Sequence, residues 1–192
     1  MSKKLLKPSA FLLPCPVGLI TSCGKDEKPN IITLAWLGII SSQPPMVSIS
    51  VRPSRYSHKL LLENGDFVIN IPSLSHLEKV DFCGNVSGKE HDKFKATNYT
   101  FQMASKVHAH IITECKLNIE CKTKKILNFG SHDVFLAEII AVQVNQEVLD
   151  ENNNWLINEI NPLAYCPPNS EYWTLGEKVG QYGLSQGKIC QK

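Results

Sequence analysis

The chain has 192 residues, of which 43% are hydrophobic and 20% are charged, and its formal net charge at pH 7 is +2. This length suits one domain with a sizeable core, and the small net charge gives no reason to expect binding to nucleic acid. The basic start MSKKLLKP precedes only a brief apolar stretch at 10–13, too short for a signal sequence or a membrane span. We therefore expect a cytoplasmic protein without a membrane association.

Residues 17–23 (VGLITSC) and 46–52 (MVSISVR) predict two strands, because they are rich in β-branched residues and bounded by turn residues. In the second segment, apolar residues alternate with Ser48, Ser50 and Arg52. Successive strand residues point to opposite faces, so these three side chains share a polar face that could line a site.

The segment SRYSHKLLLENG (54–65) predicts a helix that begins at Ser54 or Ser57 and ends at Gly65. A helix N-terminus leaves backbone N–H groups unpaired and carries partial positive charge. Ser57, His58 and Lys59, with nearby Arg52 and Arg55, could therefore hold a phosphate. The same pattern also fits an ordinary capped surface helix.

A second helix is expected in SLSHLEKVDFCG (73–84), where Ser75 and Glu78 have the spacing of a capping box and Gly84 lies beyond the helix end. Cys83 ends this helix beside a glycine-rich loop. We interpret it as a packed small residue rather than a redox thiol, since a helix C-terminus disfavours a thiolate.

Two further strands are expected in the second half. HAHIITECKLNIECK (108–122) alternates apolar and polar residues, which predicts one strand with a wet face and with Cys115 and Cys121 packed on the other face. A long strand from about 134 to 144 follows His132. The fold class is therefore mainly β, with a few short helices outside the sheet.

No metal site is expected. The seven cysteines include no C-x-x-C pair, so zinc-ribbon and thioredoxin spacings are absent and reduced thiols are expected. His108 and His110 lie two residues apart on one strand face, but no third ligand follows them.

Five segments, in this order, resemble the flavin-reductase-like FMN-binding split-barrel family, and most closely its flavoredoxin branch. They are PCPVGLITS, NIITLAWLGIISSQPPMVSISVRPSRYSHKLLLENGDFVINIP, CGNVSGKEHDKF, GSHDVFLAEI and YWTLGEKVGQYGLSQGK. The resemblance implies a split β-barrel that forms a single domain over residues 1–192, with a C-terminal tail from about residue 160 covering the site. It also implies a homodimer with one FMN in a groove near the subunit interface.

The resemblance further implies the residues that hold FMN. The predicted cofactor-binding residues are Asn30, Thr33, Ala35, Trp36, Ser50, Arg52, Ser57, His58, Lys59, Lys93, His132 and Tyr165. Lys93 and His132 are the predicted catalytic residues, because a cation beside a reduced flavin stabilises its negative charge and can supply a proton. Without the resemblance, Trp36 would be a core residue, and Lys93 and His132 would be solvated turn residues.

The function that follows is an FMN-containing oxidoreductase or electron carrier of the flavoredoxin type. It would take electrons from NAD(P)H or a protein donor and pass them to flavin, iron or another acceptor. No G-x-G-x-x-G motif is present, so a nicotinamide would bind transiently over the flavin. The alternative is a non-catalytic FMN-binding or storage module that uses the same pocket.

Overall fold

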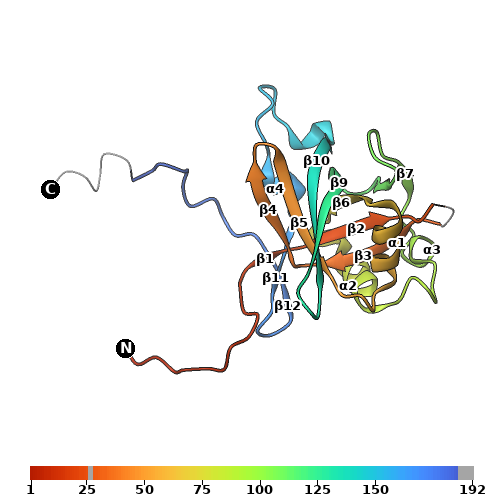
Figure 1. Cartoon of the computed structure of the whole chain (residues 1–192). Helices are drawn as coiled ribbons and strands as arrows, with labels where there is room; N and C mark the ends of the chain where they lie inside the picture. The colour runs from red at the N-terminus through yellow and green to blue at the C-terminus, as the bar shows by residue number, and fades with distance from the viewer. Residues whose placement is uncertain (26–27, 186–192) are drawn as a thin grey trace.

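The computed structural model describes residues 1–25 and 28–185, which form a mainly β structure with short helices around it (Figure 1). Seven strands pair antiparallel in one sheet. In sheet order they are β3 (Asn30–Leu34), β2 (Gly18–Ser22), β6 (Asp66–Ile71), β9 (Leu117–Asn128), β10 (Asp133–Val144), β5 (Pro45–Val51) and β4 (Leu37–Ser42).

The two edge strands of this sheet, β3 and β4, are consecutive in the chain. Only Ala35 and Trp36 separate them, so the sheet must curl until its edges approach each other. The backbone N–H of Ser50 in β5 donates to the carbonyl oxygen of Trp36 at 2.9 Å. The sheet thus becomes a barrel with a seam between β3 and β4.

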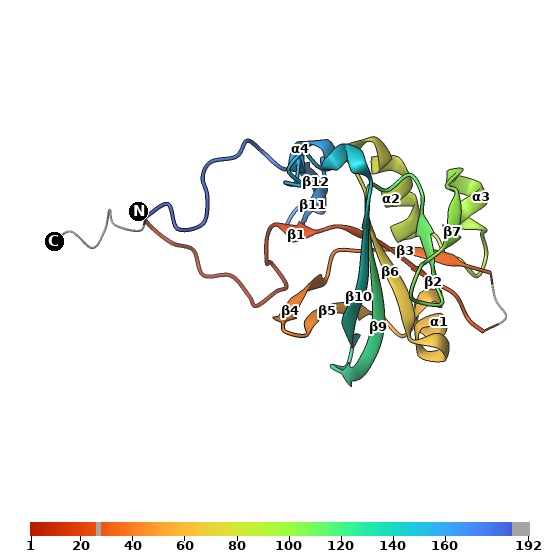
Figure 2. The same cartoon turned by 90° about the horizontal axis from the view of Figure 1, so that it is seen from above.

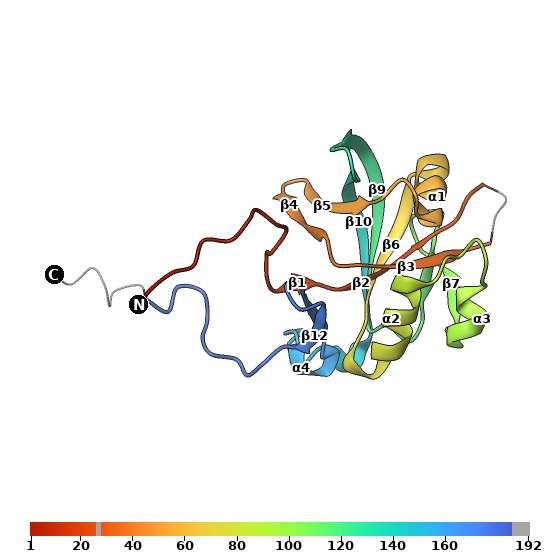
Figure 3. The same ribbon diagram turned by 90° about the horizontal axis from the view of Figure 1, so that it is seen from below.

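Smaller elements lie outside the barrel (Figure 2). A second sheet contains β1 (Cys15–Pro16), β11 (Leu163–Cys166) and β12 (Glu171–Thr174), and β7 (Phe101–Met103) pairs with β8 (His110–Ile112). The helices are α1 (Tyr56–Asn64), α2 (Leu77–Asn85), α3 (Lys93–Thr97) and α4 (Ile157–Ile160), with 3-10 turns at Leu74–His76 and Gln146–Val148. The terminal segments 1–8 and 175–185 extend away from the barrel in the same direction (Figure 3).

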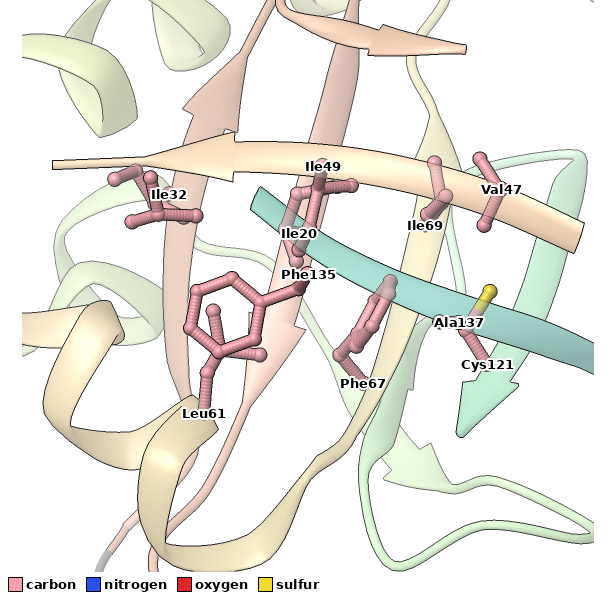
Figure 4. Close-up of a cluster of buried hydrophobic side chains, with 11 residues drawn as sticks. Ile20, Ile32, Val47, Ile49, Leu61, Phe67, Ile69, Cys121, Phe135 and Ala137 are labelled. Atoms are coloured by element: carbon pink, nitrogen blue, oxygen red, sulfur yellow. The ribbon is translucent and has the colours of Figure 1, made fainter. Parts of the chain in front are cut away.

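The barrel is filled by large apolar side chains, including Phe67 and Phe135, which are fully buried (Figure 4). A second apolar cluster lies between the outer face of β2 and β3 and the helices α2 and α3. Ile20 belongs to the first cluster, whereas Leu19 belongs to the second. Strand β2 is therefore buried on both faces, which explains its almost continuous apolar sequence.

The expected ends of the helices are only partly confirmed. Helix α1 ends at Gly65, whose φ of 78° is left-handed, as predicted. It begins at Tyr56 after Arg55, with no side-chain cap, so neither Ser54 nor Ser57 caps it. Ser57 lies inside the helix, where its hydroxyl accepts a hydrogen bond from Asn30.

The expected boundaries of the second helix are wrong. Helix α2 begins after His76, and the Ser75 hydroxyl contacts that of Ser73, so no capping box forms. Gly84 lies inside α2, at a point where the helix passes close to β3. A Cβ on Gly84 would lie 3.3 Å from the Cβ of Thr33.

The segment 108–122 is two strands rather than one, since a turn at 113–116 separates β8 from β9. Its predicted wet face is also wrong, because Asn118 and Glu120 are buried. The 104–107 loop covers Glu120, and the backbone N–H groups of Ser105 and Lys106 donate to its carboxylate at 2.9 and 2.6 Å. The Asn118 Nδ2 instead donates to the Asn70 Oδ1 at 2.8 Å. Backbone donors thus replace the water expected on this face.

Candidate functional site

A groove of about 450 Å³ opens along the seam of the barrel. Its walls come from the end of β3 and the link to β4, from β5, and from the turn before β10. It is lined by Ile32, Thr33, Leu34, Ala35, Trp36, Ser50, Arg52, Arg55, Gly84, His132, Tyr165 and Pro167, with Ser9, Ala10 and Phe11 of the N-terminal segment. A cavity of this size lies within the range of small-molecule sites, roughly 300–1,000 Å³.

The groove combines aromatic surface with positive charge. The ring of Trp36 lies 4.6 Å from that of His132, measured between centroids, and Tyr165 packs on Tyr172 at 5.5 Å. Burial and the charge of Arg52 lower the pKa of His132. Since histidine ordinarily titrates near pH 6.5, His132 is neutral at pH 7 and can donate or accept one hydrogen bond.

A second, smaller hollow of about 70 Å³ adjoins the groove, because Ile32, Arg55 and Gly84 line both. Buried Asn30 and Ser57 meet in it, and the Asn30 Nδ2 donates to the Ser57 Oγ at 2.7 Å. The Ser57 hydroxyl hydrogen is then available to a ligand. The loop residue Gly88 also lines this hollow.

Lys93 lies in the wall of the second hollow and does not reach the groove. It is buried at the start of α3, where its Nζ donates to the carbonyl oxygens of Ile31 at 2.8 Å and Cys83 at 2.7 Å. An ammonium group has three hydrogens, so one remains for a ligand. Burial lowers the Lys93 pKa to about 8. Lys93 is therefore not a solvated turn residue, and it does not share the groove with His132, the other predicted catalytic residue.

Two residues of the predicted set line neither cavity. His58 points to the side of β10, where its Nε2 lies 2.7 Å from the Oδ2 of Asp133. Lys59 is on the outer face of α1 and pairs with Glu63 at 3.5 Å. Helical geometry explains this outcome, because successive residues point in different directions and, of the three predicted residues 57–59, Ser57 alone lines the hollow.

Several residues that line the groove or the hollow were not predicted from the sequence. Arg55 stands between the two cavities, and it was considered only as part of a basic helix start. Gly84 and Gly88 permit close packing: a Cβ on Gly88 would lie 1.9 Å from the Asn30 Oδ1. The CGNVSGK segment, with two glycines near a serine, was the available signal.

The predicted tail cover is only partly present in the single chain. Tyr165 and Pro167 line the groove, but residues 175–185 extend away from it (Figure 1). Residues 186–192 lie outside the described part of the chain.

The cysteines of the described segments are free thiols. Cys83 is fully buried, and burial raises its pKa to about 11, so it carries no charge at neutral pH. Burial likewise raises the pKa of Cys121 to about 12. These values fit packed thiols rather than reactive ones.

Comparison with known proteins identifies the family. The family model "Flavin reductase like domain" matches residues 10–174. This chain belongs to the flavin reductase-like family. Membership supports a flavin-related redox role, which the aromatic and cationic groove fits.

Two solved structures support the resemblance to flavoredoxin. Flavoredoxin of Desulfovibrio vulgaris (Miyazaki F) is 32% identical with a TM-score of 0.91, over 97% of this chain and 100% of that chain. Flavoredoxin from Methanosarcina acetivorans is 31% identical with a TM-score of 0.88, over 97% and 98%. An uncharacterised protein of Archaeoglobus fulgidus is 32% identical over 142 residues, 74% of this chain and 79% of the relative. The mainly β, split-barrel fold class is confirmed.

Within 1–25 and 28–185, no helix is long and apolar enough to cross a membrane. Over the same residues, no group of three or more His, Cys, Asp or Glu side chains could hold a metal ion.

Proposed function

We propose that this protein is an FMN-dependent oxidoreductase or electron carrier of the flavoredoxin type. The observation that carries the proposal is the junction of two unlike cavities: an open groove with aromatic walls, and a small polar hollow joined to it at Arg55. A planar, largely apolar ring system suits the groove. A phosphate suits the hollow, where hydroxyl, amide and ammonium donors converge.

The residues present fit FMN at both ends. Trp36, Tyr165 and the backbone near Ala35 would border the ring, with Arg52 and His132 as polar partners. Asn30, Ser57, Lys93 and Arg55 would hold the phosphate.

When bound, FMN would supply reversible electron transfer. His132 can donate or accept a proton at a ring nitrogen, and its Nδ1 lies 2.9 Å from the Ser131 Oγ. Arg52 provides a fixed positive charge. In this proposal, Lys93 binds the phosphate in the hollow rather than the edge of the ring.

We propose NAD(P)H or a redox protein as the electron donor, and flavin, iron or another acceptor as its destination. The groove is open along the seam, so a donor could approach the ring from solvent. A storage module would use the same cavities without this exchange.

We also propose a homodimer. The terminal segments 1–13 and 175–185 carry exposed apolar side chains, such as Leu5, Leu12, Leu175 and Val179. Apart from residues 9–11, which line the groove, they extend away from their own barrel (Figure 3). A second copy would bury these side chains, and its segments would complete the cover of the groove.

Rapid mixing of the purified, oxidised protein with NADH or NADPH tests this function. The flavin absorbance should bleach with one of them, and chromatography of the heat-released chromophore should identify FMN. A protein that takes up no flavin would overturn the proposal. A protein that binds FMN but is reduced by neither nucleotide nor a protein donor would be the storage module, and released FAD would revise the cofactor.

A further inference from the structure

The Asp133 carboxylate joins three elements at one end of the barrel. Asp133 begins β10, and its Oδ2 lies 2.7 Å from the Nε2 of His58 in α1. Its Oδ1 accepts a hydrogen bond of 2.7 Å from the Nδ2 of Asn128, the last residue of β9. Asp133 also stands opposite Val51 at the end of β5.

Three residues of this cluster, His58, Val51 and Asp133, are each next in sequence to a residue of the proposed flavin site. His58 follows Ser57, which lines the hollow, and Asp133 follows His132, which lines the groove. Val51 precedes Arg52 in the groove. None of His58, Asp133 and Asn128 lines either cavity, so the cluster lies behind the site.

We propose that the Asp133 carboxylate, held by His58 and Asn128, is a positioning group that fixes His132 in the groove relative to Ser57 in the hollow. The proposal rests on the proposed function, because it takes the two cavities to be the two ends of one flavin site. The carboxylate provides a direct side-chain bond between the start of β10, next to the turn that holds His132, and α1 beside Ser57.

The pair is sheltered enough to act in this way. Only 9% of the His58 side chain and 14% of the Asp133 side chain are exposed. The His58 ring packs edge-on against Phe135 at 5.7 Å, which fixes its orientation from behind. Hydrogen bonds from His58 and Asn128 lower the pKa of Asp133, so the carboxylate is ionised at neutral pH. A charged acceptor gives stronger and shorter hydrogen bonds than a neutral one.

The position of His132 can be measured without any cofactor. Its ring lies 4.6 Å from that of Trp36, so the Trp36 ring current should displace the NMR signals of the His132 ring protons. His132→Gln would assign these signals, and Trp36→Leu would give their values without the indole. All spectra are recorded on the full-length apo protein near pH 8, where the ring is neutral.

His58→Leu is the principal variant, because it removes the donor but keeps an apolar side chain against Phe135. We expect the His132 signals to move towards their Trp36→Leu positions. We also expect the FMN dissociation constant to rise about tenfold, which corresponds to about 1.4 kcal/mol. His58→Gln retains an N–H donor of similar reach and should preserve both readouts. Asp133→Asn, which keeps the shape of the side chain, should give an intermediate effect.

Glu138→Gln is the matched control. It removes an ion pair on the same two strands, between the Lys124 Nζ and the Glu138 Oε2 at 2.7 Å, without touching the site. This variant should leave the His132 signals and the FMN affinity unchanged. Folded His58→Leu and Asp133→Asn proteins with wild-type His132 signals would overturn the proposal. A wild type that binds no flavin would defeat the proposed function instead, and the His132 signals would still decide the positioning role.

Discussion

Lys93 shows how burial changes the role of a residue type. On the surface, lysine keeps a pKa near 10.4, but burial lowers that of Lys93 to about 8. The two carbonyl oxygens that it contacts belong to Ile31 and Cys83, in β3 and α2. Lys93 therefore ties these elements together while it presents one N–H to the hollow.

This geometry predicts a pH dependence of FMN binding. A bound phosphate favours the ammonium form and raises the Lys93 pKa above about 8. Below that pH, Lys93 is charged with or without FMN, so affinity is constant. Above it, the apo protein must take up a proton to bind, and the dissociation constant should rise by up to about tenfold per pH unit.

Fluorescence titrations of FMN between about pH 7 and 9 measure this slope. Lys93→Met should bind FMN more weakly at pH 7 and show a flatter profile. A wild-type affinity that stays constant across this range would contradict the placement of Lys93 beside the phosphate.

Gly88 tests the close packing of the hollow. In Gly88→Ala, the new Cβ would lie 1.9 Å from the Asn30 Oδ1, so buried Asn30 must move and its bond to Ser57 must distort. We expect the free energy of unfolding to fall by about 1–3 kcal/mol, as in other overpacked sites, and FMN affinity to fall with it. Urea unfolding measures the first effect. Gly38→Ala, whose new Cβ meets no atom within 4 Å, is the control and should change neither quantity.

At the scale of elements, sequence patterns predicted those strands and ends whose cause is local. Gly65 marked the end of α1 because a left-handed residue is needed there. The strand expected from about 134 to 144 is β10, which begins one residue earlier at Asp133. The break at 113–116 was missed, because the apolar alternation continues through the turn. Only the tertiary structure shows the break, because β8 pairs with β7 whereas β9 belongs to the seven-stranded sheet.

The site was predictable to a similar extent. The segment from Asn30 to Trp36 was identified because polar residues interrupt an apolar strand, and the resemblance supplied a reason. The contact between His58 and Asp133 spans 75 positions, and that between Lys93 and Ile31 spans 62. No local pattern could indicate such pairs, so His58 was assigned to the cofactor and Lys93 to the ring edge.

A further prediction concerns Glu120 in strand β9. This buried carboxylate accepts hydrogen bonds from Ser105, Lys106 and Gln143, and these bonds lower its pKa despite the opposing effect of burial. Glu120→Gln replaces one acceptor oxygen by a donor, so buried N–H groups lose their partner. We expect the free energy of unfolding at pH 7 to fall by about 2–3 kcal/mol.

Urea unfolding of Glu120→Gln and of Glu138→Gln compares a buried carboxylate with a more exposed one on neighbouring strands. The exposed Lys124–Glu138 pair should contribute less than about 1 kcal/mol. Equal losses in the two variants would show that the loop bonds to Glu120 do not stabilise this region. A lowered pKa also means that the contribution of Glu120 should disappear as pH falls through that pKa.

At the scale of the whole molecule, the terminal segments carry the assembly prediction. One chain has a mass of 21.5 kDa, so the proposed homodimer should have twice that mass, 43 kDa, by light scattering. Deleting residues 1–8 together with 176–192 removes most of the extended apolar surface. It should weaken both dimerisation and FMN binding, because the partner would no longer cover the groove. A full-length monomer that retains FMN would contradict this arrangement.

The central claim is that the groove and the hollow are the two ends of one FMN site. Riboflavin has the same ring system as FMN but lacks the phosphate, so parallel calorimetric titrations of the apo protein with the two compounds test the claim directly. We predict one FMN per chain and an affinity for riboflavin at least about 100-fold lower, as expected when charge-assisted hydrogen bonds to a phosphate are lost. Equal affinities, or no binding of either compound, would contradict the account.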